Sequence, residues 1–335
     1  MFFSSKSRFA QFFISPLFKE DCINRELNAV ESEFRQYEFN DNWRVSQASR
    51  LLFDQSHPEA KFNVGNLKTL QIEDIRTRLL QFYEAQYSAN RMKLVIKGRE
   101  PMNKLEEAVT RMFGEVPNRD VSKDNLDSNP FGKKEKGTYM KIKTLSPKDL
   151  LSISFQLPST RDRYQFKTLE LLSYLINYEG AGGLYSVLAN AGLALSVVSS
   201  ISPETASYAI FEVNIYLTDD GFNSINQIVS TVLKFMEQVQ AGIPDWIFDD
   251  YRKIQKISFN YKEGSDSVRG LTKMVEQMFW FRPRDILFGP FMISRADKFR
   301  IQQFSRLMNM DNMLVTLASD KFDVSEMQSE SWYGT

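Results

Sequence analysis

The sequence predicts an α+β protein made of two domains in tandem. Residues 151–157 and 208–217 alternate apolar and polar side chains, as strands with one buried face do. Stretches with helical periodicity surround these predicted strands. Residues 118–137 are rich in Asn, Asp, Lys, Ser and Pro and lack periodicity. Since a chain of 335 residues can build two cores, we expect a domain at 1–117, a linker at 118–137 with nothing apolar enough to pack, and a domain at 138–320.

The composition is that of a folded protein without a charge bias. Apolar residues make up 42% of the chain and charged residues 25%, with 42 basic and 42 acidic side chains. No overall field therefore favours nucleic acid or an anionic membrane as a partner. Apolar runs such as 12–18 are too short to cross a bilayer. Cys22 is the single cysteine, which excludes an internal disulfide and favours a reducing, cytoplasmic location.

The first domain is predicted to be mainly helical. A helix at 21–38 is followed by helices at 41–53, 71–87 and 103–113, with a strand at 93–97 before the last of them.

The helix at 21–38 carries two carboxylates on one face. Glu26 and Glu33 are seven positions apart, which is nearly two turns of an α-helix. Such a pair repels unless a cation lies between or beside the two groups. The alternative is a solvated acidic face with Arg25 and Arg35 as counter-charges.

The second domain is predicted to hold the larger sheet. Its expected strands are 139–145, 151–157, 195–200, 208–217 and 313–318, and its expected helices are 165–177, 222–240, 244–259, 268–281 and 296–308. A glycine loop at 179–183 follows a helix instead of a strand and lacks the Lys-Ser/Thr pair of a P-loop. This context argues against nucleotide binding.

Several segments resemble the inverzincin zinc metalloproteases, specifically the insulin-degrading enzyme and pitrilysin branch. The matching segments are RFAQFF, NRELNAVESE, HPEAKFNVGNLKTL, YSANRMKLVIKGRE and WYGT, spread from Arg8 to Thr335. The resemblance implies two tandem inverzincin domains, each a mostly antiparallel sheet with helices on one face. It implies that the first domain is incomplete and that 321–335 begins an interdomain connection. The activity implied for the complete enzyme is zinc-dependent cleavage of short peptides.

The same resemblance assigns roles to the acidic helix. Glu33 matches the third protein ligand of zinc, and Glu26 matches the supporting acid of the catalytic site. The family's other ligands and its base come from an H-x-x-E-H motif, which this sequence lacks. The single histidine, His57, precedes a proline and is read as a turn residue. Because a catalytic zinc needs three protein ligands, we expect this chain alone to bind no zinc and to cleave no peptide, unless a complementary chain supplies the motif or the second half of the chamber.

The resemblance also points to a peptide-binding exosite. In insulin-degrading enzymes the matching glycine loop and a following strand pair their backbone with the amino end of a bound peptide. Two positions depart from that pattern: Tyr178 stands where some members have His, and Ser199-Ser200 where some have Gly-Gly. A plain connecting loop beside a sheet remains the alternative. The expected exosite residues are Glu179, Gly180, Gly182, Gly183, Val197, Val198 and Ser199.

Two functional hypotheses follow. In the first, the chain is part of a zinc metalloendopeptidase and is inactive by itself. In the second, it is a non-catalytic peptide-binding or partner protein that retains the exosite. Both predict peptides as partners and exclude nucleic acid. An aromatic run at 277–285 lacks the interleaved basic residues of a base-stacking surface.

Overall fold

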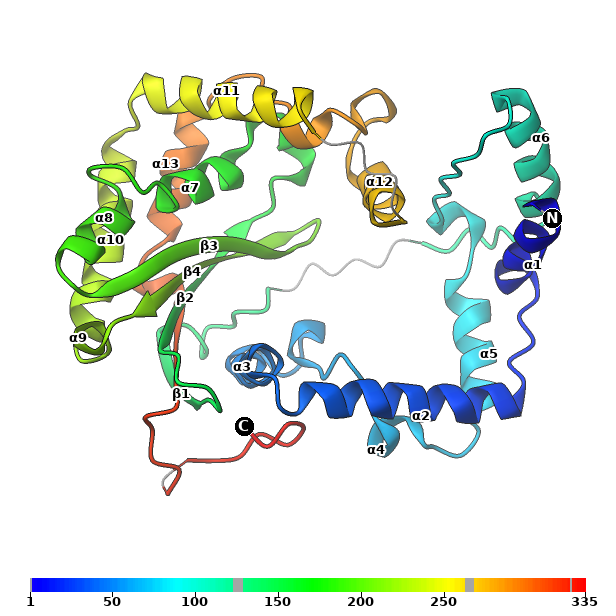
Figure 1. The fold of residues 1–335 in the computed structure, drawn as a ribbon, viewed down its shortest axis with the longest axis horizontal. Helices are drawn as coiled ribbons and strands as arrows, with labels where there is room; N and C mark the ends of the chain where they lie inside the picture. The colour runs from blue at the N-terminus through cyan, green and yellow to red at the C-terminus, as the bar shows by residue number, and fades with distance from the viewer. Residues whose placement is uncertain (1, 123–128, 263–267, 326) are drawn as a thin grey trace. The chain divides into compact units, whose positions relative to one another are not determined.

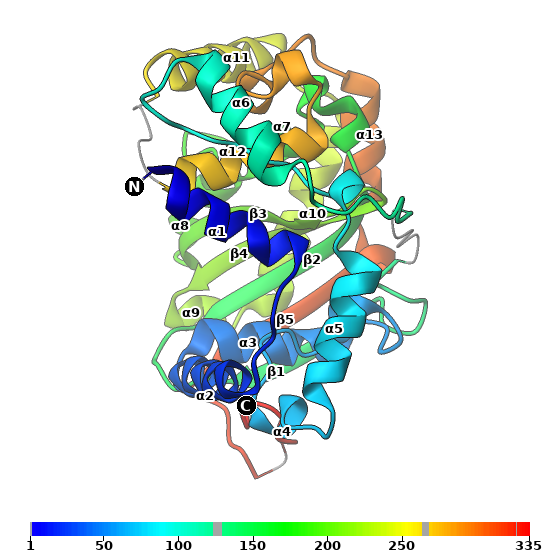
Figure 2. The same cartoon turned by 90° about the vertical axis from the view of Figure 1, so that its right-hand side faces the viewer.

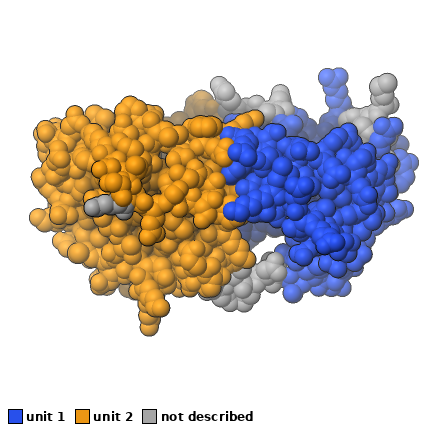
Figure 3. Space-filling view, turned by 90° about the horizontal axis from the view of Figure 1, so that it is seen from below, with its two compact units in different colours: residues 1–35, 64–125, 264–286 blue, residues 36–63, 126–263, 287–335 orange. Residues whose placement is uncertain are grey.

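The computed structural model describes residues 2–122, 129–262, 268–325 and 327–335 (Figure 1). They form two compact units, each assembled from several stretches of the chain (Figure 3). The expected domains, 1–117 and 138–320, are each one continuous stretch of the chain, and this division remains a prediction. Part of the expected linker, 123–128, lies outside the described residues. Unit 1 contains Met1–Arg35, Val64–Asn125 and Gly264–Ile286, and unit 2 contains Gln36–Asn63, Leu126–Glu263 and Leu287–Thr335.

Unit 1 is helical in the part that the structure describes. Ala10 of α1 packs against Ala108 and Met112 of α6. The Tyr83 hydroxyl of α5 donates to the carbonyl oxygens of Phe13 and Ile14, at 2.8 Å each. These contacts join helices that are far apart in the sequence. The helices are α1 (Phe2–Ile14), α2 (Glu20–Tyr37, which continues into unit 2), α4 (Leu67–Leu70), α5 (Ile75–Gln86), α6 (Met102–Phe113) and α12 (Val268–Trp280).

The strand predicted at 93–97 does not form. Residues 92–98 are not paired in any ladder, and the described part of unit 1 contains no other strand. A strand is held by hydrogen bonds to a neighbouring strand, so an apolar run without such a neighbour stays irregular. The prediction at 93–97 is therefore wrong for this structure.

Unit 2 is organised around a five-stranded sheet in the order β1-β5-β2-β4-β3 (Figure 2). β1 and β5 are parallel, whereas the other three neighbouring pairs are antiparallel. The predicted mostly antiparallel sheet is confirmed. β3 and β1 are the two edges, and β4 lies beside β3. The strands are β1 (Thr138–Lys143), β2 (Leu150–Pro158), β3 (Ala194–Glu204), β4 (Tyr208–Leu217) and β5 (Met313–Ser319).

Helices cover one face of this sheet, as predicted (Figure 1). Phe155 of β2 and Phe211, Val213 and Ile215 of β4 are completely buried beneath them. Burying each such side chain contributes about 1.5–3 kcal/mol, so the alternation seen in the sequence fixes which face holds the core. The helices of unit 2 are α3 (Asp41–Ser49), α7 (Thr168–Ile176), α8 (Leu184–Asn190), α9 (Asp219–Phe222), α10 (Ile225–Ala241), α11 (Asp245–Asn260) and α13 (Lys298–Leu307).

Short 3-10 turns complete the described elements. They are η1 (Arg50–Leu52), η2 (Pro58–Ala60), η3 (Ala89–Arg91), η4 (Arg161–Phe166), η5 (Pro283–Asp285), η6 (Gly289–Phe291) and η7 (Met310–Asn312). None of the helices in the described ranges combines the length and the apolar character that crossing a membrane requires.

The other face of the sheet is only partly covered. Leu52 of η1 and Phe131 pack on Tyr208, Ile210 and Leu314. Phe131 is 2% exposed, and its backbone N–H donates to Gln156 Oε1 at 2.9 Å. The expectation that nothing in the linker packs is therefore wrong at this residue, because a single aromatic side chain anchors the segment without any periodic pattern.

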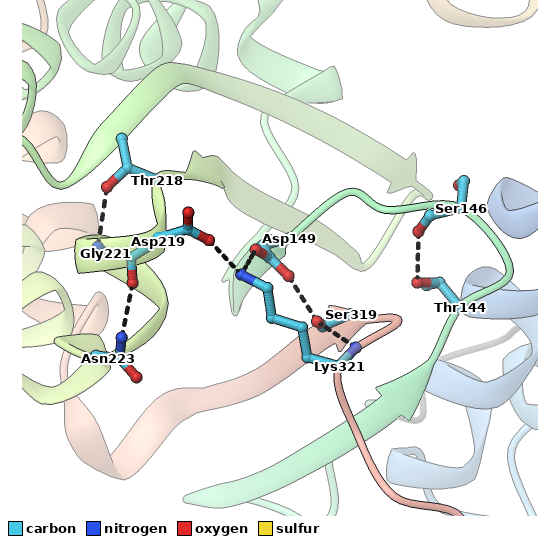
Figure 4. Close-up of polar contacts among 9 residues, drawn as sticks. All are labelled: Thr144, Ser146, Asp149, Thr218, Asp219, Gly221, Asn223, Ser319 and Lys321. Atoms are coloured by element: carbon cyan, nitrogen blue, oxygen red, sulfur yellow. Dashed lines mark hydrogen bonds and ion pairs between the residues drawn. The ribbon is translucent and has the colours of Figure 1, made fainter.

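A lysine joins three strand ends at one end of the sheet (Figure 4). Lys321 Nζ, just after β5, contacts Asp149 Oδ2 at 2.7 Å and Asp219 Oδ1 at 2.6 Å. Ser319 Oγ donates to the other oxygen of Asp149 at 2.5 Å. The contacts tie the start of β2, the end of β4 and the end of β5 together. Thr218 begins α9 beside them, and its hydroxyl accepts the Gly221 N–H at 2.9 Å.

Candidate functional site

The acidic helix predicted at 21–38 is present as α2. Glu20 and Asp21 lie in its first turn, where carboxylates are favoured by the helix dipole. Ile23 and Phe34 are its buried side chains. Glu26 and Glu33 are exposed and lie seven positions apart in one continuous helix, so they share a face. Their assignment to a zinc site stays a prediction.

A third carboxylate of α2, Glu31, has a structural role that the sequence did not reveal. Its Oε2 accepts the Leu67 backbone N–H at 2.9 Å, and its Oε1 accepts Arg35 Nε at 2.8 Å. The hydrogen bond from Leu67, with a smaller contribution from Arg35, lowers the pKa of Glu31 below its usual range. Leu67 is the first residue of α4, so Glu31 satisfies one of the unpaired N–H groups at that helix start.

The residues that the structure describes do not by themselves fit a zinc ion. No three of their His, Cys, Asp and Glu side chains come together as a ligand set, although a catalytic zinc requires three protein ligands. His57 is 3% exposed, and its Nδ1 accepts the Glu59 backbone N–H at 3.0 Å at the start of η2. This confirms His57 as a turn residue. Glu33 is left as a single candidate ligand.

The glycine loop links α7 to α8 in a tight turn. The Gly183 N–H donates to the Gly180 carbonyl at 3.0 Å. Gly182 has φ +85°, and a Cβ on Gly183 would lie 2.1 Å from the Tyr178 carbonyl oxygen. The turn therefore requires glycine at both positions. Glu179 is exposed at the start of the loop.

The predicted exosite strand is an edge of the sheet. β3 is hydrogen-bonded to β4 alone among the described strands, with Val197 opposite Ile215, Val198 opposite Asn214 and Ser199 opposite Val213. The side chains of Val197 and Ser199 are buried, whereas Val198 is 48% exposed.

A hydrogen bond shows the direction of the backbone groups. The Ser199 N–H donates to Asn177 Oδ1 at 2.7 Å, so it points away from β4. Since backbone groups alternate along a strand, the N–H and C=O of Val197 also point outward, and those of Val198 point toward β4. A proline at Ser199 would remove an outward donor, whereas a proline at Val198 would break the pairing with β4.

The outward donor of Ser199 is part of a small polar network. Ser199 Oγ lies 3.0 Å from Asn177 Oδ1 and 2.7 Å from Ser173 Oγ. Asn177 directly follows α7, two positions before Glu179, so the structure brings the end of that helix onto the strand. The only sequence signal for this network was the departure at Ser199-Ser200 from the Gly-Gly pair that the resemblance implies.

An edge strand beside a glycine loop, in a sheet with helices on one face, defines unit 2 as an α+β fold. The family model "Peptidase M16 inactive domain" matches residues 74–255, and "Middle or third domain of peptidase_M16" matches 259–335. The chain belongs to the peptidase M16 family. The predicted resemblance to the insulin-degrading enzyme and pitrilysin branch is confirmed.

Curated relatives carry the same family resemblance. Human insulin-degrading enzyme is 29% identical over 98% of this chain and 33% of its own length. The A-factor-processing enzyme of Saccharomyces cerevisiae is 32% identical over 99% of this chain and 33% of its own length. "Insulin-degrading enzyme-like 1, peroxisomal" from Arabidopsis thaliana is 29% identical over 98% of this chain and 34% of its length. The chain thus spans about a third of these relatives.

Solved structures show the same fold. Pitrilysin superimposes with a TM-score of 0.93 at 24% identity, over 99% of this chain and 36% of that one. A peptidase M16 inactive domain from Pseudomonas fluorescens has a TM-score of 0.69 at 18% identity, over 94% of this chain and 74% of that one. The fold is therefore that of the pitrilysin type.

Proposed function

We propose that the chain is the peptide-binding part of a zinc metalloendopeptidase that degrades short peptides, and that it is inactive alone. The observation that carries the proposal is the position of β3 at the edge of the sheet, with the glycine loop at the end of the neighbouring α7. An extended peptide can add to such an edge through main-chain hydrogen bonds. The single cysteine, Cys22, favours the cytoplasm as its compartment.

The proposed roles follow the direction of the backbone groups. Val197 and Ser199 offer outward main-chain groups, and the exposed Val198 side chain contacts the side chains of the peptide. Gly180, Gly182 and Gly183 form the turn, and Glu179 holds the peptide's amino terminus. Because Asn177 already occupies the Ser199 donor, the peptide must displace it. Ordering a peptide on one edge offsets most of the gain, so we expect micromolar or weaker binding.

Glu33 is proposed to supply one zinc ligand, with Glu26 as its supporting acid. The described residues do not complete such a site, so other residues or a complementary chain must contribute the remaining ligands and the base. A non-catalytic peptide-binding protein is the second candidate, because the edge strand supports binding without any metal.

The test compares peptides with free and acetylated amino termini on the wild type and on Ser199→Pro. We expect the free peptide to bind the wild type best and to lose affinity about tenfold in the variant, since proline removes the outward N–H that the peptide would accept as a hydrogen bond. Circular dichroism checks that the sheet persists. Equal affinities in all four combinations would exclude an exosite at β3.

A metal assay separates the two candidates. We expect the chain alone to hold no stoichiometric zinc and to cleave no peptide. A sample reconstituted with a chain carrying H-x-x-E-H should bind zinc and cleave peptide, and Glu33→Gln should abolish both activities. If the reconstituted sample binds peptide but its metal content is unaffected by Glu33→Gln, the second candidate is favoured.

A further inference from the structure

The face of the sheet opposite its hydrophobic core holds a cavity of about 860 Å³. It lies between the strands and α3 with its following turn, all within unit 2. Both views place α3 beside the β1 and β5 side of the sheet (Figures 1 and 2). Ligand pockets have volumes of about 300–1,000 Å³, so this cavity has room for a few residues of a peptide.

The floor of the cavity is a polar row across three strands. Glu212 of β4 lies opposite Ser154 of β2 and Ser200 of β3. The Ser154 hydroxyl donates to Glu212 Oε1 at 3.4 Å, and the Ser200 hydroxyl donates to Oε2 at 3.2 Å. In the next row, Ser152 Oγ lies 2.6 Å from Asn214 Oδ1. A central strand whose opposite side is the hydrophobic core thus presents a carboxyl group to the cavity.

This carboxyl group has lost much of its hydration without gaining a cation. Burial raises the pKa of Glu212, although the hydroxyl groups of Ser200 and Ser154 and the Asn214 side chain oppose the shift. Arg50 and Lys148 also line the cavity. Arg50 is paired with Glu59 at 3.8 Å, and among the described residues no ion pair reaches Glu212. Hydroxyl donors only partly replace the water that an ionised carboxylate loses.

The walls around this group are suited to an alkyl stem. Leu150, Ile210, Tyr216 and Leu314 line the cavity together with Glu212. Lysine and arginine side chains place their methylene stems along such apolar surface and direct the charged head to a polar partner. An anion would be repelled by the carboxylate. A metal ion needs several oxygen ligands, and no three His, Cys, Asp or Glu side chains of the described residues come together to hold one.

We propose that this cavity binds the ammonium or guanidinium group of a lysine or arginine side chain of a peptide, with Glu212 as its counter-ion. The hydroxyls of Ser154 and Ser200 hold the carboxylate from both sides and leave it directed at the cavity. This site lies on the sheet face, whereas the proposed exosite uses the outward backbone groups of β3. It therefore goes beyond the proposed function, and peptides without a free amino terminus can occupy it.

The experiment uses the full chain and acetyl-Ala-Lys-Ala-amide, with the norleucine analogue as the neutral match. Binding is followed by saturation-transfer NMR titration. We expect the lysine peptide to bind wild type about tenfold more tightly than the norleucine peptide, because hydrogen bonds to charged groups are stronger than those between neutral groups. Glu212→Gln should abolish this difference in affinity. The control, Glu237→Gln, removes the same charge at an exposed position on α10 and should leave the difference unchanged.

A second variant distinguishes loss of the binding site from a folding defect in Glu212→Gln. Ser200→Lys places an ammonium group next to Glu212 and should suppress binding of the lysine peptide by a similar factor. Equal affinity for the two peptides in the wild type, or an unchanged preference in Glu212→Gln, would overturn the proposal. Because both peptides are acetylated, loss of this binding is distinguishable from failure of the exosite, which is measured with free amino termini. Binding of n-butylamine as tight as the lysine peptide would also contradict it, since the peptide's remainder would then contribute nothing.

Discussion

Asn177 Oδ1 accepts the backbone N–H of Ser199 at 2.7 Å and thereby occupies an outward donor of the edge strand β3. Unpaired edges are prone to pair with other chains, so a side chain in this place protects the edge. The same bond competes with any peptide that adds to β3. The affinity of the proposed exosite for a peptide therefore depends in part on how readily the Asn177 side chain gives up this hydrogen bond.

The first prediction concerns this competition. Asn177→Ala should strengthen binding of a peptide with a free amino terminus by about two- to tenfold, because the competing hydrogen bond is worth about 0.5–1.5 kcal/mol. Fluorescence polarisation with a labelled peptide measures the change. Asn190→Ala, at the exposed end of α8, is the control and should leave the affinity unchanged. Weaker binding to Asn177→Ala would mean that Asn177 contacts the peptide directly.

The second prediction concerns the stability of unit 2 as a function of pH. The raised pKa of Glu212 means that the folded state holds this proton more tightly than the unfolded state. Stability should therefore fall as pH rises from the usual range near 4.5 through the folded pKa. Glu212→Gln removes this pH-dependent loss of stability. Its melting temperature should therefore exceed that of the wild type at pH 8 but not at pH 4.

Asp41 and Glu59 also line this cavity and are unchanged in the variant, so their contributions cancel from the difference between variant and wild type. Hydrogen bonds from Ser146 and the Leu145 N–H lower the pKa of Asp41 against the effect of burial. A melting-temperature difference that is independent of pH from 4 to 8 would contradict a raised pKa at Glu212.

The regular elements of unit 2 could be predicted because their side chains face a single core. The strand expected at 208–217 has the same bounds as β4, where Phe211, Val213 and Ile215 are completely buried. The strand expected at 195–200 is shorter than β3, Ala194–Glu204. The pairing of β3 shifts register between Ile201 and Glu204, and such a shift interrupts the alternation on which the prediction relied.

The features that could not be predicted from the sequence depend on contacts between residues far apart in the chain. The run at 93–97 has strand character but lacks a partner strand in the described part of unit 1. Phe131 packs on Leu52 and Leu314, which are far from it in the sequence. For the candidate site, the glycine loop and the β3 segment were expected, whereas the bond from Ser199 to Asn177 required the position of α7 beside the strand. No local pattern encodes that position.

The third prediction concerns the anchor in the expected linker. Phe131→Ala should lower the free energy of unfolding of unit 2 by about 3–5 kcal/mol, the usual cost of removing a buried aromatic ring. Phe39→Ala is the matched control, because Phe39 also belongs to unit 2 but is 82% exposed. Urea denaturation measures both variants. Cleavage by a protease near 131 should rise in Phe131→Ala alone, and equal stability of the two variants would show that the ring does not anchor the segment.

The last prediction separates two carboxylates that lie two positions apart on α2. Glu31 accepts the Leu67 N–H and pairs with Arg35, whereas Glu33 is exposed. Glu31→Gln should lower the free energy of unfolding of unit 1 by about 1 kcal/mol, comparable to the loss of a helix cap. Glu33→Gln should stay within about 0.5 kcal/mol of the wild type, as exposed substitutions do.

The pH dependence of this pair sharpens the test. Because the folded pKa of Glu31 is depressed, its stabilising effect is present above the usual glutamate range and is lost as pH falls through the folded value. The difference in the free energy of unfolding between Glu31→Gln and the wild type should therefore shrink in acid. Urea unfolding at pH 7 and pH 3 measures both variants. If Glu33→Gln is the more destabilising change at pH 7, then Glu33 supports the fold of α2. Its proposed role as a zinc ligand would then lose its basis.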